Sequence, residues 1–211
     1  MVAVKFWLPA TSSLVIFALA SVLNAGVIAV ESLSSLLKVN NPYFATYQQV
    51  IKDVNGEIIE TSQGQVGIRG KEIRWVISKP FEQVIIVSDG KISIYDPDLA
   101  QVIHRSVEES FYINPMSLLI EKNFDLAKQF NVESMVTDLG LSFSLTPIKE
   151  GVSIPKFDLL FENAGLKELK ISDDFGQEVD IKFYPSTIDI ENDVFRLDLK
   201  ALEDVDVIGE R

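Results

Sequence analysis

Few side chains in this sequence have the type and spacing that catalysis or metal binding requires. The chain has one histidine, His104, within a stretch that alternates like a β-strand. A lone histidine in a strand is more often a surface or hydrogen-bonded residue than a ligand, and no second histidine completes a transition-metal cluster. The absence of cysteine excludes zinc–thiolate sites, thiol catalysis and disulfides. The sequence therefore predicts no catalytic residue and no metal site.

Two acidic pairs, Asp96/Asp98 and Asp173/Asp174, remain as candidates for acid–base chemistry or calcium binding. Each pair lies beside proline or glycine turn signals, where aspartate hydrogen-bonds the backbone of its own turn. The spacing of a calcium-binding loop is absent. Segment 67–70 lacks the Lys-Ser/Thr of a phosphate-binding loop. An enzyme is therefore a less favoured function than a binding protein. The enzyme that would fit best is an exported hydrolase that uses carboxylates, and no cofactor is predicted.

The composition indicates one acidic globular domain with a large apolar interior. Hydrophobic residues make up 47% of the 211 residues, and 13 of the aromatic residues are phenylalanine. The net charge is −12, and no basic stripe interrupts it. A nucleic acid duplex would be repelled by such a surface, so nucleic acid is not expected as a partner.

The N-terminus resembles an export signal. Residues 1–29 carry one charge, followed by an apolar run at Leu14–Leu23 and small residues near a cleavage point. Cleavage is predicted after Ala25 or after Ala29, and a single domain then spans 30–211. An uncleaved membrane anchor is the alternative, but polar and glycine interruptions after the run favour cleavage.

The rest of the chain predicts mostly strands. Segment 31–38 reads as a short amphipathic helix, which Asn40-Asn41-Pro42 ends. Asn55-Gly56 and Asp89-Gly90 are hairpin turn signals between apolar runs. The strands predicted around these turns cover 43–53, 57–68, 73–77, 83–88, 91–95 and 101–105.

The second half contains two helical pieces and further strands. Asn114-Pro115 opens a predicted helix through Ile120, and 125–130 is a second piece. Alternating apolar residues then predict strands around 141–145, 157–161, 169–171, 179–183 and 195–199. Short strands at this even spacing indicate an antiparallel sheet rolled toward a barrel.

The apolar face of such a sheet allows two interpretations. Two or three short helices cannot cover a whole barrel interior tightly. A half-open barrel closed by a helical lid would leave a cavity for a large lipophilic ligand. The alternative is a solid core packed by the same apolar rows. Which strand parity faces inward is also open, because a one-residue slip would exchange the two sets of side chains.

The block Gly64–Trp75 (GQVGIRGKEIRW) together with Gln83–Val102 (QVIIVSDGKISIYDPDLAQV) goes beyond generic hairpin chemistry. Together these segments resemble the LolA family, the periplasmic carriers that shuttle lipoproteins to the bacterial outer membrane. The resemblance extends from about Glu31 to Ile208 and includes the NPMSLL segment that begins at Asn114. Two features depart from the family pattern: Gly70 stands in place of a usual proline, and a double proline before the C-terminal strand is missing.

The resemblance implies a fold and a set of site residues. The fold is an incomplete antiparallel β-barrel, mainly β with short α, closed by a lid of short helices. Arg69 matches the family's functional arginine and is expected to latch the lid through hydrogen bonds to lid carbonyls. The expected lid residues are Leu36, Leu37, Leu118 and Leu119. The expected acyl-chain cavity residues are Ile73, Trp75, Ile94, Phe143, Leu159, Phe161, Ile181 and Phe183.

The implied function is non-catalytic transport by a periplasmic monomer. It would take acylated lipoproteins from an inner-membrane ABC-type release complex and deliver them to an outer-membrane lipoprotein receptor. The related receptor is itself a lipoprotein, and the absence of cysteine argues against that identity. The alternative is an exported carrier or sensor for another lipid, such as a glycolipid or a fatty acid.

Overall fold

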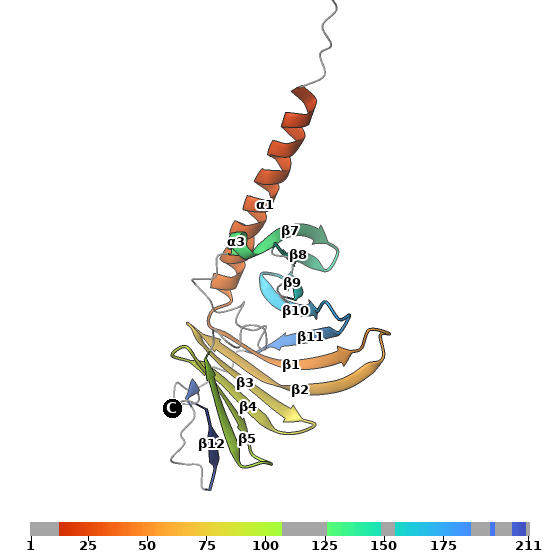
Figure 1. Ribbon diagram of the computed structural model, residues 1–211. Coiled ribbons are helices and arrows are strands. Elements are labelled where there is room, and N and C mark those ends of the chain that lie inside the picture. The colour runs from red at the N-terminus through yellow and green to blue at the C-terminus, as the bar shows by residue number, and fades with distance from the viewer. Residues whose placement is uncertain (1–12, 107–125, 149–154, 187–194, 197–203, 210–211) are drawn as a thin grey trace, which may run out of the picture.

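A computed structural model describes residues 13–106, 126–148, 155–186, 195–196 and 204–209, with the backbone alone for 13–25. Its main feature is one curved 12-stranded sheet with a long N-terminal helix against one end (Figure 1). The helix predicted at 114–120, with Leu118 and Leu119, lies outside the described residues.

Helix α1 (Ser13–Val39) is longer than the predicted helix at 31–38. The apolar run of the expected export signal and the amphipathic segment form one continuous helix, since no proline or strong breaker separates them. Its N-terminal part extends away from the sheet, whereas its C-terminal part reaches the strands (Figure 1). The helix ends as predicted at Asn40, whose N–H donates to the Leu36 carbonyl at 3.0 Å. Within the described residues, no helix is both long and apolar enough to cross a membrane.

The described strands follow the predicted ones closely in the first half. They are β1 (Tyr43–Lys52), β2 (Ile58–Arg69), β3 (Glu72–Lys79), β4 (Gln83–Ser88), β5 (Lys91–Asp96) and β6 (Gln101–Ser106). The second half adds β7 (Phe130–Thr137), β8 (Gly140–Pro147), β9 (Lys156–Glu162), β10 (Gly165–Ser172), β11 (Glu178–Pro185) and β12 (Asp206–Ile208).

The sheet is an open half-barrel with the strand order β12-β6-β5-β4-β3-β2-β1-β11-β10-β9-β8-β7. Neighbours in this order pair antiparallel, except that β12 pairs parallel with β6. Strands β1 and β11 join the two halves at the centre, although 125 or more residues separate them in sequence. The mainly β architecture expected from the sequence is therefore confirmed, and the strands at the two ends of the order, β7 and β12, do not close the barrel.

Three details differ from the predicted elements. The helical piece at 125–130 is described as a four-residue helix α3 (Leu126–Gln129), because Phe130 already begins β7. Strand β7 was not predicted, since its polar and apolar residues alternate only over Phe130 and Val132. Phe195 has helical rather than strand conformation, while the remainder of 195–199 beyond Arg196 is not described.

One face of the sheet, called the inner face here, carries the main apolar cluster. Strand side chains alternate between faces, and alternate residues are buried along β9 and over parts of β1, β3 and β8. The C-terminal part of α1 contacts β7 and α3 and covers the inner face at that end of the sheet (Figure 1). The outer face carries the opposite set of side chains. The fold thus positions a continuous apolar surface under a helix.

Candidate apolar binding face

The register of the sheet determines which parity faces inward. Residues that pair across antiparallel strands share a face, so one row of the inner face runs from Ala45 through Val66, Trp75 and Ile85 to Ile94. A second set on the other half joins Phe143 to Leu159, Leu169 and Ile181. Together with Tyr43, Tyr47, Ile73, Phe157, Phe161 and Phe183, these residues belong to one apolar cluster.

All eight residues expected to line an acyl-chain cavity lie on this inner face. Seven of them are buried: Ile73, Trp75, Phe143, Leu159, Phe161, Ile181 and Phe183. Ile94 is half-buried and packs against the same cluster. The structure therefore brings the predicted set together from both halves of the chain. Their contact with an acyl chain remains a prediction.

An aromatic group occupies the centre of the inner face. The rings of Tyr47 and Trp75 lie 4.0 Å apart between centroids, and Trp75 meets Phe183 edge-on at 6.4 Å. Tyr43 also meets Phe183 edge-on, at 6.0 Å. Edge-to-face contacts of this kind add to the stabilisation from area burial alone. Tyr43 and Tyr47 were not among the predicted site residues, although their spacing with Ala45 in an alternating strand gave a signal for the same face.

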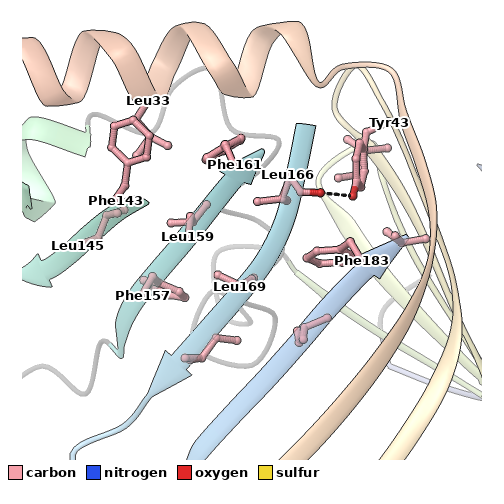
Figure 2. Packing of buried hydrophobic residues seen from close by; sticks show 14 of the residues in the cluster. Leu33, Tyr43, Phe143, Leu145, Phe157, Leu159, Phe161, Leu166, Leu169 and Phe183 are labelled. Atoms are coloured by element: carbon pink, nitrogen blue, oxygen red, sulfur yellow. Dashed lines mark hydrogen bonds between the residues drawn. The ribbon is translucent and has the colours of Figure 1, made fainter. Parts of the chain in front are cut away.

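Helix α1 lies over one part of this face. Leu33 has no exposed surface and lies beside Phe143 and above the row of inner-face side chains (Figure 2). Ala29, one turn earlier, is 1% exposed. Leu36 and Leu37, the expected lid residues of this helix, are half-buried against the cluster. Ala29 and Leu33, four residues apart, lie on the same stripe of the helix, and Leu33 is not among the expected lid residues.

Arg69 occupies a different position from the apolar residues. It is the last residue of β2, and its pairing with Glu72 places it on the outer face, opposite to Ile68 and Ile73. The guanidinium carbon lies 5.7 Å from the ring centroid of Phe44 and 5.1 Å from that of Phe195. Such stacking is a common cation–π arrangement of arginine. The lid segment that would accept its hydrogen bonds lies outside the described residues, so the latch remains a prediction.

Two consecutive asparagines connect the end of α1 to two turns of the sheet. Asn40 donates through Nδ2 to the carbonyls of Leu36 and Ala164 and accepts from the Leu166 N–H. Asn41 accepts from the Gly70 N–H at 2.7 Å and donates to the Gly70 carbonyl at 2.8 Å. The Asn40-Asn41 pair was predicted only as a helix end. In the structure it also joins α1, the β9–β10 turn and the turn after Arg69.

Two kinds of polar group are buried in or near the inner face. Burial raises the pKa values of the Tyr43 and Tyr47 phenols well above their ordinary range, so both stay neutral. Their hydroxyls donate to the carbonyls of Leu166 and Val76. The Ser62 hydroxyl is buried, and it has no hydrogen-bond partner among the described residues. Gln49, which pairs with Ile181 and Ser62, adds a half-buried polar side chain to the same face.

The residues with potential chemistry occupy structural positions. His104 Nδ1 lies 2.9 Å from Ser93 Oγ, its cross-strand partner, and burial followed by the charge of Lys91 lowers the pKa of its imidazole. Asp96 accepts from the Leu99 N–H, and Asp173 from those of Phe175 and Gln177, as predicted for turn aspartates. The described part of the chain contains no group of three potential metal ligands.

Comparison with known proteins agrees with this architecture. The family model described as outer membrane lipoprotein carrier protein LolA matches residues 41–198. A relative from Chromohalobacter salexigens, named outer-membrane lipoprotein carrier protein, is 30% identical over 85% of this chain and 86% of its own. A protein of the same name from Dechloromonas aromatica is 33% identical over 74% of this chain and 75% of its own.

A solved structure shows the same fold without close sequence similarity. The crystal structure of a DUF1329 family protein from Desulfovibrio piger is 10% identical, with a TM-score of 0.50. The superposition includes 85% of this chain and 99% of the Desulfovibrio piger protein. With so little sequence identity, the comparison indicates a shared fold and nothing about function.

Proposed function

Since this chain belongs to the LolA family of outer-membrane lipoprotein carrier proteins, we propose that it is a periplasmic, monomeric carrier of acylated lipoproteins. It takes them from an inner-membrane ABC-type release complex, shields their acyl chains on the inner face, and delivers them to an outer-membrane receptor. No catalytic step is part of this role. The export signal within residues 1–29 is cleaved after Ala25 or after Ala29, and cleavage after Ala25 retains Ala29, which is buried in the apolar cluster.

The observation that carries the proposal is the continuous apolar inner face beneath α1. It draws side chains from both halves of the sheet, and α1 contacts it at the end formed by β7. Acyl chains are long, flexible and apolar, so their natural receptor is an apolar surface of matching length. Leu33 and its neighbours occupy part of that surface in the described state. Cargo entry therefore requires α1 to move away from it.

The energetics of the cargo explain why α1 should bind the inner face with only moderate strength. Three acyl chains contain on the order of 50 carbons, each worth about 0.8 kcal/mol when buried. Non-covalent affinity saturates near about 20 kcal/mol, so no equilibrium carrier extracts such an anchor from a bilayer unaided. An energy source at the inner membrane must load the carrier. The helix must also compete with the chains for the inner face, so that they can be released again.

The test is transfer of a labelled triacylated lipoprotein. Purified protein lacking the export signal is incubated with inner-membrane vesicles that hold the release complex and the labelled cargo, with and without ATP. We expect ATP-dependent appearance of soluble label in a one-to-one complex. A matched sample with a polar substitution on the inner face, Leu159→Asn, should release far less label. Leu99→Asn, at an exposed turn position, should behave like the unmodified protein.

Absence of soluble label, with a known carrier working in the same vesicles, would contradict lipoprotein transport. Analysis of lipids that co-purify with the protein then addresses the second candidate, a carrier or sensor for another lipid. A glycolipid or fatty acid recovered in stoichiometric amount would favour that function. The inner face suits both candidate functions, because its apolar side chains would contact the acyl chains and not the headgroup.

A further inference from the structure

We propose that Asn41 is a positioning residue for Arg69, and that it acts by holding the Gly70 peptide unit with its side-chain amide. The inference rests on the proposed function in one respect, since a carrier of this family is expected to use Arg69 as the latch of its lid. The position of Arg69 itself is a property of the folded chain and can be measured without cargo.

The contact between Asn41 and Gly70 is reciprocal. The side-chain oxygen accepts the Gly70 N–H at 2.7 Å, and the side-chain nitrogen donates to the Gly70 carbonyl at 2.8 Å. Two hydrogen bonds from one planar amide fix both the position and the orientation of the peptide unit. Gly70 has φ +62°, and a Cβ built there meets nothing within 4 Å. No neighbour packs against the Gly70 Cα where a side chain would stand, so the Asn41 amide adds a restraint on this turn to that of the Arg69–Glu72 pairing.

The restrained turn directly follows Arg69. Gly70 and Lys71 connect β2 to β3, and Arg69 and Glu72 are the last paired residues before the turn. A shift of the Gly70 peptide therefore changes the backbone direction at Arg69. Because the arginine side chain is long, a small rotation of its backbone moves the guanidinium by several times as much.

The guanidinium contacts two rings that lie on different segments. Phe44 belongs to β1, three residues after Asn41, and Phe195 comes from the C-terminal part of the chain and has no exposed surface. Segment 41–44 thus supplies both the amide that holds the turn and one of the rings. Phe195 fixes the other side. The two contacts together select one position for the guanidinium out of the many that a surface arginine otherwise samples.

The neighbouring Asn40 makes a different set of contacts and provides the matched control. Its amide bonds to α1 and to the β9–β10 turn, and none of its hydrogen bonds reaches Gly70. Asn40→Ala therefore loosens the same corner of the molecule without releasing the turn after Arg69. Asn41→Ala removes both bonds to Gly70, while Asn41→Asp keeps the oxygen that accepts the Gly70 N–H and loses the donor.

The first measurement is NMR of the cargo-free protein. The Arg69 Nε–Hε signal is shifted by the ring currents of Phe44 and Phe195. We expect Asn41→Ala to return it toward the position of a free arginine and to accelerate Gly70 amide exchange by about tenfold, the loss expected for about one hydrogen bond. For Asn41→Asp, the Arg69 shift and the Gly70 exchange rate should lie between those of the unmodified protein and Asn41→Ala. Asn40→Ala should leave both unchanged.

The second measurement is delivery of the labelled triacylated lipoprotein from the purified complex to outer-membrane vesicles. If Asn41 acts through Arg69, Asn41→Ala reduces delivery, and the double variant with Arg69→Leu is no worse than Arg69→Leu alone. Losses that multiply in the double variant would overturn the inference. An unchanged Arg69 signal in Asn41→Ala, or an equal change in Asn40→Ala, would overturn it as well.

The two measurements separate this inference from the proposed function. If the unmodified protein takes up no lipoprotein, lipoprotein transport is wrong. The NMR comparison still decides whether Asn41 positions Arg69, because it needs no cargo.

Discussion

The Tyr43 hydroxyl donates a buried hydrogen bond of 2.9 Å to the Leu166 carbonyl, across 123 residues of sequence (Figure 2). Tyr43 begins β1, whereas Leu166 lies in β10, and strand β11 runs between these two strands. The β9–β10 pairing shifts register between Leu166 and Glu168. Bulges of this kind bend a strand locally and increase its twist. The bond therefore fixes the curved part of the sheet where its two halves meet.

Tyr43→Phe tests this bond. The substitution keeps the ring and its contact with Phe183 and removes only the donor to a buried carbonyl. We expect the free energy of unfolding to fall by about 1–2 kcal/mol. Tyr184→Phe removes a hydroxyl that bonds to Gln48 at an exposed site and should cost less than about 0.5 kcal/mol. Urea denaturation of both variants makes the comparison, and equal losses would argue against a special role for Tyr43.

Leu33→Ala tests the packing of α1 on the inner face. Leu33 has no exposed surface, so truncation leaves a cavity against Phe143 and its neighbours. The expected loss of stability is about 2–5 kcal/mol. Leu99→Ala, at a position that is 68% exposed, should change stability by less than about 0.5 kcal/mol. A small effect at Leu33 would mean that the helix readily leaves the face.

Ser62→Ala tests a hydroxyl of the inner face that has no hydrogen-bond partner within the described ranges. Removing a buried polar group that lacks a hydrogen bond relieves its desolvation cost, so we expect stability to stay unchanged or to rise by about 1 kcal/mol. Ser78→Ala at an exposed position is the control. A loss of more than about 1 kcal/mol at Ser62 would reveal a partner for this hydroxyl in the folded protein.

The pKa of His104 is expected below its ordinary value of about 6.5. The unfolded chain then binds the proton more readily than the folded protein. Stability attributable to His104 is therefore constant above about pH 6.5 and falls as the pH drops from there to the folded-state pKa. Since the chain has a single histidine, its imidazole proton signal gives the titration directly. A midpoint at or above 6.5 would contradict the burial of this side chain.

Arg69→Leu tests the proposed latch. If Arg69 stabilises the closed lid, its loss lets cargo stay bound, because closure no longer competes with the acyl chains. We expect a soluble lipoprotein complex to form, while delivery to outer-membrane vesicles falls by about tenfold or more, the value of one charged hydrogen bond. Arg69→Lys keeps the charge without the planar set of donors and should be intermediate. Loading and release equal to the unmodified protein would remove the latch from the mechanism.

The sequence by itself determined the local elements and the family. Asp-Gly and Asn-Gly turns between alternating apolar runs specify hairpins through short-range backbone preferences, and the strands β1 to β6 lie where these signals placed them. Segments with a weak apolar pattern were predicted less completely. Strand β7 has a regular apolar row only at its start. Asn24 and Gly26 interrupt the apolar run, yet the helix continues through them into the amphipathic segment.

The tertiary structure alone decided which face of each strand is apolar and what surrounds Arg69. Parity depends on register, which is fixed by pairing between β1 and β11 and not by either strand alone. The Asn41–Gly70 contact spans 29 residues, and Phe195 reaches Arg69 across 126 positions. Contacts at such separations form because the curved sheet brings distant segments together, and local sequence patterns do not predict them.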